Sequence, residues 1–168
     1  MQDFLKRISS YNLFNYLFPG VLFAVIGEKI SPWSFVHENI IITLFFCYFY
    51  GTVISRIGSL IIDPVMKILR IIKEKDYKTY IIARQEDTMI QVLSEVNNTY
   101  RTIISLILSL LCLYGASECS KLYPCTYAFI YTTLPIALLI LFSFSYRKQN
   151  NYILKRITAA LSKEKDEK

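Results

Sequence analysis

The chain alternates long apolar runs with shorter polar connections. Four stretches carry no charged residue, namely Ile8–Gly27, Asn39–Ser55, Thr102–Ser117 and Leu122–Tyr146. A helix needs roughly 20 apolar residues to cross about 30 Å of hydrocarbon, and the shorter runs can be extended inward, the second through Arg56 to Ile62. The pattern predicts an all-α, polytopic membrane protein with four transmembrane helices at residues 8–27, 39–62, 102–117 and 122–146.

Basic residues fall in alternate connections between these runs. Of the 19 Lys and Arg residues, only Lys29 and Lys121 lie in the two connections that the layout places outside. Short loops rich in Lys and Arg resist translocation and set orientation. We therefore expect both termini in the cytoplasm, with residues 63–101 as a cytoplasmic helical insertion and 147–168 as a cytoplasmic tail.

The first run resembles a signal peptide because basic residues precede it. It lacks a convincing small-residue cleavage site before Glu28 and carries Pro19-Gly20 in its middle, so we interpret it as a retained transmembrane helix.

The net charge of +6 does not require a nucleic-acid partner. The topology rule and attraction to anionic lipids of the inner leaflet would produce the same bias. We expect a bilayer with an anionic inner leaflet as the partner of this charge, and no direct nucleic-acid binding.

Small side chains recur along the second run. Gly51, Ser55 and Ser59 are four residues apart, and Gly58 widens the same groove. Such stripes let helix backbones approach closely in a membrane. They predict helix packing, either within one chain or between copies in a homo-oligomer.

Polar residues gather where the second and third runs approach the cytoplasm. The predicted inner-boundary cluster comprises Arg56, Asp63, Glu95, Asn97, Asn98 and Arg101. A charge within the membrane boundary is costly unless it is paired or reaches the headgroups, so Arg56 is interpreted as an interfacial anchor or as a pathway residue. The cluster either orients the cytoplasmic helix or acts as a two-state latch.

Amphipathic patterns predict helices outside the membrane. Met66–Lys73 is typical of a basic helix on the inner leaflet, and Glu86–Tyr100 has helical spacing and leads into the third run. The tail predicts an amphipathic helix that bundles with its copies, lies on the membrane or docks a partner. Its candidate docking residues are Tyr152, Ile153, Lys155, Arg156 and Ile157.

Two cysteines flank the short loop between the third and fourth runs. Cys119 and Cys125 would lie on the outer side, where an oxidising compartment permits a disulfide, while two free thiols are the alternative.

The chain lacks the usual signs of catalysis. It has one histidine, His37, and no phosphate loop, metal-ligand spacing or nucleophile elbow. We expect no catalytic, cofactor-binding or metal-binding residues, and no enzyme. A channel function remains an alternative, because hydroxyl groups and backbone carbonyls can line a pore.

Three short blocks resemble small four-span membrane proteins of bacterial anti-phage defence systems. The blocks are YNLFNYLFPG at Tyr11–Gly20, ISRIGSLIIDP at Ile54–Pro64 and LSEVNNTYRT at Leu93–Thr102. They are most similar to the KwaA family, the membrane subunit of the Kiwa system. The resemblance implies a homo-oligomer of the bacterial inner membrane that senses phage attachment and works through a cytoplasmic partner.

Three functions follow as hypotheses. The first is a sensor and scaffold subunit of an antiviral defence complex that recruits a cytoplasmic effector. The alternatives are a pore-forming effector or ion channel that depolarises the inner membrane, and an assembly factor for a larger membrane complex.

Overall fold

The computed structural model describes residues 13–73, 77–123 and 125–166, and these ranges contain helices without a strand. In chain order they are the π-helical turn η1 (Leu13–Leu17), α3 (Phe18–Ile30), α4 (Ile40–Ile57), the π-helical turn η2 (Gly58–Ile62), α5 (Asp63–Ile68), α6 (Tyr77–Glu86), α7 (Met89–Leu122) and α8 (Cys125–Asp166). The all-α prediction is confirmed for these residues.

Three helical segments are long and apolar enough to cross a membrane, as expected of a multi-pass membrane protein. They are Ile40–Ile68, Met89–Leu122 and Thr126–Thr158, and they cover all or most of three of the four predicted spans. The remaining predicted span, residues 8–27, begins outside the described residues, and the 13 residues of α3 would cover only about 20 Å. A fourth span therefore stays a prediction.

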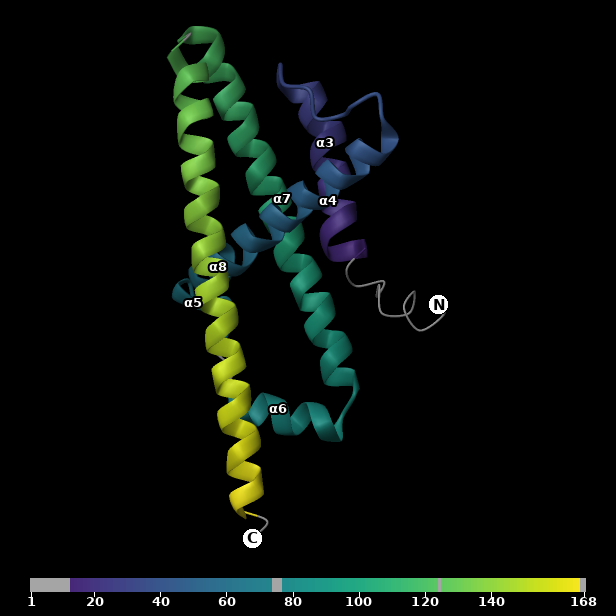
Figure 1. Cartoon of the computed structure of the whole chain (residues 1–168), viewed down its shortest axis with the longest axis vertical. Helices are drawn as coiled ribbons and strands as arrows, with labels where there is room; N and C mark the ends of the chain where they lie inside the picture. Colours follow the sequence, from purple (N-terminus) through teal and green to yellow (C-terminus); the bar gives the residue numbers. More distant parts are fainter. Residues whose placement is uncertain (1–12, 74–76, 124, 167–168) are drawn as a thin grey trace.

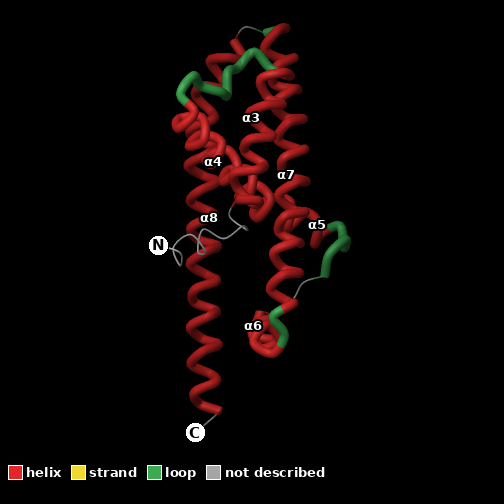
Figure 2. Tube along the Cα trace, turned by 90° about the vertical axis from the view of Figure 1, so that its right-hand side faces the viewer, coloured by secondary structure: helices red, strands yellow, loops and turns green. Residues whose placement is uncertain are grey.

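The spanning helices differ in direction. α7 and α8 form a long hairpin around Tyr123 and splay apart away from it, while α4 crosses α7 obliquely (Figures 1 and 2). The α3–α4 loop lies at the hairpin end, because the rings of Trp33 and Tyr127 make an edge contact with centroids 6.1 Å apart. α6 lies across the opposite end (Figure 1).

The connection after α4 differs from the prediction of one basic helix over Met66–Lys73. α5 ends at Ile68, and Arg70 takes a left-handed φ of 58°. The amides of Ile71 and Ile72 donate back to the Met66 carbonyl, which satisfies a terminal carbonyl of the helix and turns the chain. α6 follows, and the spacing of apolar residues in the sequence did not predict this helix.

From Met89 onward, the predicted helix over Glu86–Tyr100 forms the first part of α7 and leads into the third apolar run, as expected. The carboxylate of Asp87 accepts a hydrogen bond from the Met89 amide at 2.8 Å, at the start of α7. The predicted amphipathic tail likewise continues α8 without a break to Asp166. Both membrane helices thus run directly into the segments predicted to be cytoplasmic.

Small and polar side chains fill much of the interior. The buried apolar residues in the described chain are Ala24, Cys47, Ile54, Ile62 and Leu106, whereas the buried polar ones are Asn15, Ser55, Thr102, Ser105, Ser117, Ser120 and Ser145. Large apolar side chains such as Ile41, Phe45 and Leu139 lie on the outside. This arrangement is typical of helices that meet through small residues while lipid covers their apolar faces.

The closest helix crossing joins the η1–α3 segment to α4. A Cβ added to Gly20 would overlap the backbone of Cys47, and one added to Gly51 would overlap the backbone of Tyr16. Both glycines therefore allow backbone-to-backbone contact that no larger residue permits.

Candidate functional site: a polar junction where the helices meet

Asn15 links three segments of the chain in the buried interior. Its side-chain amide donates to Ser55 Oγ at 3.3 Å, and its oxygen accepts from Thr102 Oγ1 at 2.8 Å. The Thr102 hydroxyl also lies 3.0 Å from the Asn98 carbonyl. Asn15 is 1% exposed, so its hydrogen bonds replace those that water would make. It ties η1 to both α4 and α7.

Arginines lie beside this amide from two helices. Arg56 of α4 donates from Nη2 to the hydroxyl of Tyr16 at 3.4 Å. Arg101 of α7 packs against η2, because a Cβ added to Gly58 would approach Arg101 Cγ at 3.3 Å and Ser105 Oγ at 2.8 Å. Gly58 thus makes room for the stem of a long basic side chain.

Lys148 connects α8 to the same region of the structure, next to η2 and α5. Its ammonium donates to the Ser59 carbonyl and, at 2.9 Å, to Ser59 Oγ. It also lies 4.0 Å from Asp63 Oδ2, which pairs more closely with Lys67 at 3.1 Å. These contacts tie α8 to η2 and α5. We call Asn15, Tyr16, Ser55, Arg56, Gly58, Ser59, Asp63, Lys67, Arg101, Thr102, Ser105 and Lys148 the polar junction.

The segments that meet here include two π-helical turns. η1 carries Asn15 and Tyr16, and η2 carries Gly58 and Ser59, with the Asp63 amide donating five residues back to the Gly58 carbonyl. Such wider turns shift backbone groups out of the regular ladder and are frequent at functional sites. Here the Ser59 carbonyl accepts a hydrogen bond from another helix.

Positive charge exceeds negative charge in the junction. The charged groups that act on Lys148 are one carboxylate, Asp63, and three cations, Arg101, Lys67 and Arg56. Lys148 and the charged groups that act on it therefore comprise four basic side chains and one acid. Arg101 Nε is buried without a hydrogen-bond partner, as are Ser105 Oγ and Ser109 Oγ further along α7.

The junction residues of α7 and α8 lie at similar distances from the hairpin turn. Arg101 precedes the end of α7 at Leu122 by 21 residues, about 32 Å along the axis. Lys148 follows the start of α8 at Cys125 by 23 residues, about 35 Å. Both distances are close to the thickness of the hydrocarbon core, about 30 Å.

The residues of the predicted packing stripe lie at three different contacts. Gly51 and Ser55 face η1, Gly58 faces α7, and Ser59 contacts Lys148 of α8. The stripe is covered within one chain.

The predicted inner-boundary cluster is divided. Arg56, Asp63 and Arg101 belong to the junction, and Asn98 contributes its carbonyl. Asn97 is exposed, and Glu95 accepts from Gln91 on the surface of α7 at 3.0 Å. Arg56 and Asp63 take other partners, Tyr16 and Lys67, rather than each other.

The disulfide between Cys119 and Cys125 and the docking of a partner by the tail stay predictions. Cys119 is an exposed free thiol, and the side chain of Cys125 lies outside the described residues. The docking candidates Tyr152, Ile153, Lys155, Arg156 and Ile157 are all exposed on α8. Tyr152 packs against Tyr77 of α6, with ring centroids 5.8 Å apart.

No protein-family model, curated protein or solved structure matches this chain. Its function is therefore inferred from its own residues and geometry.

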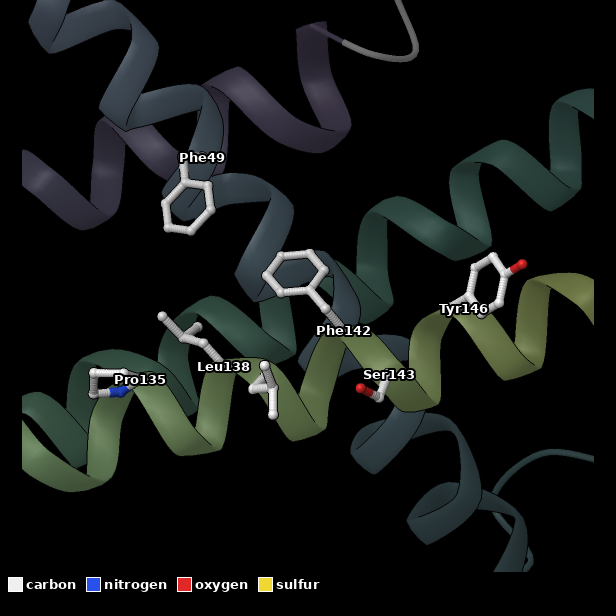
Figure 3. A pocket seen from close by; sticks show the side chains of 7 residues that line it. Phe49, Pro135, Leu138, Phe142, Ser143 and Tyr146 are labelled. Carbon is white, nitrogen blue, oxygen red and sulfur yellow. The ribbon is translucent and has the colours of Figure 1, made fainter.

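The described residues contain no cluster of three or more His, Cys, Asp or Glu side chains suited to a metal ion. An open apolar groove lies where α8 passes Phe49 of α4 (Figure 3). Its only side-chain hydroxyls belong to Ser143 and Tyr146, and the stacked rings of Phe49 and Phe142 lie 6.2 Å apart. This lining suits apolar groups rather than a polar substrate.

A second hydrogen-bonded site lies at the hairpin end. The Glu28 carboxylate accepts from the amides of Val36 at 3.0 Å and Phe35 at 3.3 Å, and from Ser34 Oγ at 3.1 Å. The bond from the Val36 amide is the main reason that the pKa of Glu28 lies below its ordinary value. Glu28 thus fixes the path of the α3–α4 loop.

Sequence reasoning missed six members of the junction, namely Asn15, Tyr16, Lys67, Thr102, Ser105 and Lys148. An amide inside an uncharged run was the available signal for Asn15, since a polar side chain at such a depth needs a partner on another helix. Lys148 gave no comparable signal, because a basic residue just after a span is expected in any case.

Proposed function

We propose that this chain is a membrane-embedded sensor and scaffold that recruits a cytoplasmic effector protein, in a bacterial inner membrane with both termini inside. The observation that carries the proposal is the length of the hairpin helices. α7 has 34 residues and α8 has 42, about 51 and 63 Å, and the hydrocarbon core takes up only about 30 Å of each. Each helix therefore projects well beyond the bilayer on the side of the polar junction.

The projecting parts form a connected platform. Arg84 of α6 donates to Gln91 of α7 at 2.7 Å, and Tyr77 of α6 packs against Tyr152 of α8. Unbroken helices transmit a displacement of their membrane segments to this platform, and the polar junction couples the segments where they leave the bilayer. The exposed face with Ile153 and Ile157 is the surface proposed to dock the effector.

The antiviral context rests on the sequence resemblance to anti-phage membrane subunits. A homo-oligomer is proposed from the outward face of α8, where Leu139, Ile140 and Phe144 are at least half exposed and available to a second copy.

Affinity purification tests recruitment. The tagged chain, expressed with its neighbouring genes and extracted in mild detergent, is expected to retain one cytoplasmic protein at a fixed ratio. Ile153→Asp with Ile157→Asp should abolish retention. The matched control, Asn151→Asp with Thr158→Asp, adds the same charge on a different face of α8 and should retain the protein. Failure to retain any cytoplasmic protein, or equal loss in both variants, would contradict the proposal.

The second candidate function is a pore-forming effector. The buried hydroxyls of Ser105 and Ser109, which lack partners among the described residues, favour it because hydroxyls can line a pore. A pore predicts that expression, alone or with phage infection, depolarises the cells, and that Ser105→Ala with Ser109→Ala reduces the effect. An unchanged potential-sensitive dye signal under both conditions excludes this function.

A further inference from the structure

We propose that the polar junction binds the phosphate of an anionic phospholipid headgroup at the inner surface of the membrane. The proposal requires that α7 and α8 cross the bilayer with the junction on the cytoplasmic side, and it does not depend on recruitment of an effector.

The first step of the argument is the charge imbalance. Arg56, Lys67, Arg101 and Lys148 come from three separate parts of the sequence. The first three act electrostatically on Lys148, and Asp63 is the single carboxylate that does so. That carboxylate pairs at 3.1 Å with Lys67 and only at 4.0 Å with Lys148. One acid cannot neutralise four half-buried cations, so the junction retains an excess of three positive charges. Half-buried like charges repel one another strongly because water screens them poorly.

The second step is an unused donor. Arg101 Nε is buried without a hydrogen-bond partner, and the neighbouring Ser105 Oγ is also unpartnered. Arg56 has its 3.4 Å bond to the Tyr16 hydroxyl, a neutral group that leaves the guanidinium charge uncompensated. Arginine forks match phosphate oxygens in geometry, and a charged acceptor forms stronger bonds than a neutral one.

The third step is depth. Arg101 and Lys148 lie about 32 and 35 Å along their helices from the hairpin turn, close to the thickness of the hydrocarbon core. Phospholipid phosphates lie just beyond that boundary. The side chains of Lys67, Lys148 and Asp63 are 38%, 27% and 20% exposed, so the cluster is open to the surrounding lipid. A lipid phosphate is therefore the anion already present at this position.

Native mass spectrometry of the full-length detergent-solubilised protein tests the site, with phosphatidylglycerol as the probe and phosphatidylcholine as its zwitterionic control. We expect phosphatidylglycerol to bind more tightly than phosphatidylcholine. Each Lys or Arg near an anionic surface contributes about a fivefold change in affinity, so Arg101→Gln with Lys148→Gln should weaken binding about 25-fold. Asp63→Asn should strengthen it about fivefold.

The matched control removes two cations elsewhere on α8. Lys155→Gln with Arg156→Gln lowers the net charge equally but leaves the junction intact, and it should bind phosphatidylglycerol like the parent chain. Size-exclusion chromatography reports whether each variant keeps its fold. If the Arg101/Lys148 variant loses it, the opposite shifts expected for Lys148→Gln and Asp63→Asn decide the question.

Three results would overturn the proposal. If the control substitutions weaken binding as much as the junction substitutions, the protein responds to charge without a specific site. If phosphatidylcholine binds as tightly as phosphatidylglycerol, no anionic headgroup is recognised. If millimolar sodium phosphate displaces the lipid completely, the site belongs to free phosphate instead of a headgroup.

Discussion

α4 and α8 are both long apolar helices, yet they make very different contacts. In its most apolar window α4 has 22% of its residues buried within the chain, and α8 has none. The difference lies in side-chain size. Gly51 lets α4 meet η1 backbone to backbone, and Gly58 of η2 makes room for side chains of α7. In contrast, α8 presents large residues such as Leu139 and touches the other helices at a few points, notably Phe142 and Lys148.

The comparison shows that hydrophobicity alone does not select helix partners in a membrane. Lipid is as apolar as leucine, so a leucine-rich face gains little by turning inward. Close approach and hydrogen bonds supply the preference instead. α4 therefore packs more closely within the molecule than α8, whose contacts include the Phe49–Phe142 ring pair and the hydrogen bonds of Lys148.

The largest expected effect comes from filling the closest helix crossing. Gly51→Leu places a side chain into the backbone of Tyr16, and overpacking of this kind should reduce the free energy of unfolding by about 3 kcal/mol or more. Gly115→Leu is the control, because a Cβ there meets nothing within 4 Å, and it should change the value by less than about 0.5 kcal/mol. Detergent unfolding followed by circular dichroism measures both. Equal losses would show that the crossing is not tighter than the open surface of α7.

Truncating a buried leucine in a packed helix should cost more unfolding free energy than truncating an exposed leucine on α8. Leu106 of α7 is 5% exposed, and Leu106→Ala should cost about 2–3 kcal/mol of unfolding free energy. Leu139→Ala on α8, where the side chain is 71% exposed within the single chain, should cost less than about 0.5 kcal/mol in the monomer. The same unfolding assay applies. A large loss at Leu139 would mean that α8 is covered, as it would be by a second copy.

Buried hydrogen bonds give the next smaller effect. Asn15→Ala and Thr102→Val should each lower the unfolding free energy by about 1–2 kcal/mol, because each leaves a buried partner unsatisfied. In a double-mutant cycle the two changes should be coupled by about 1 kcal/mol, within the range seen between membrane helices. Additive effects would contradict the 2.8 Å contact.

The smallest effect concerns pH at the hairpin end. Because the pKa of Glu28 is lowered by the Val36 amide, its contribution to loop stability is present above the unfolded pKa and is lost as pH falls through the folded value. The fluorescence of Trp33, the only tryptophan, should report this acid transition. Glu28→Gln removes the titrating group and should abolish it, while Glu38→Gln, in the same loop, should leave it unchanged.

The sequence was sufficient to predict three helices of membrane-spanning length, because their signal is local. Runs without charge, as in Leu122–Tyr146, leave a long helix as the main structure that satisfies every backbone group in lipid. The contacts of Gly51 and Gly58 were predicted only as packing, since spacing gives the face of a helix but not the partner that covers it.

The rest of the structure depends on contacts between distant segments. Asn15 gains its role from Ser55 and Thr102, which lie 40 and 87 residues away. α6 has a weak apolar pattern of its own and is linked to α7 through Arg84. The π-helical turns depend on tertiary packing as well, so periodicity could not predict them.

Topology is the central claim, and impermeant thiol labelling in sealed vesicles tests it most directly. Single-cysteine chains are made with the native Cys119, with His37→Cys at the same end, and with Arg84→Cys or Thr158→Cys at the other end. We expect Cys119 and position 37 to be labelled in intact right-side-out vesicles, and positions 84 and 158 only after the membrane is opened. Labelling of position 158 and Cys119 from the same side would contradict a membrane-spanning hairpin and a cytoplasmic platform.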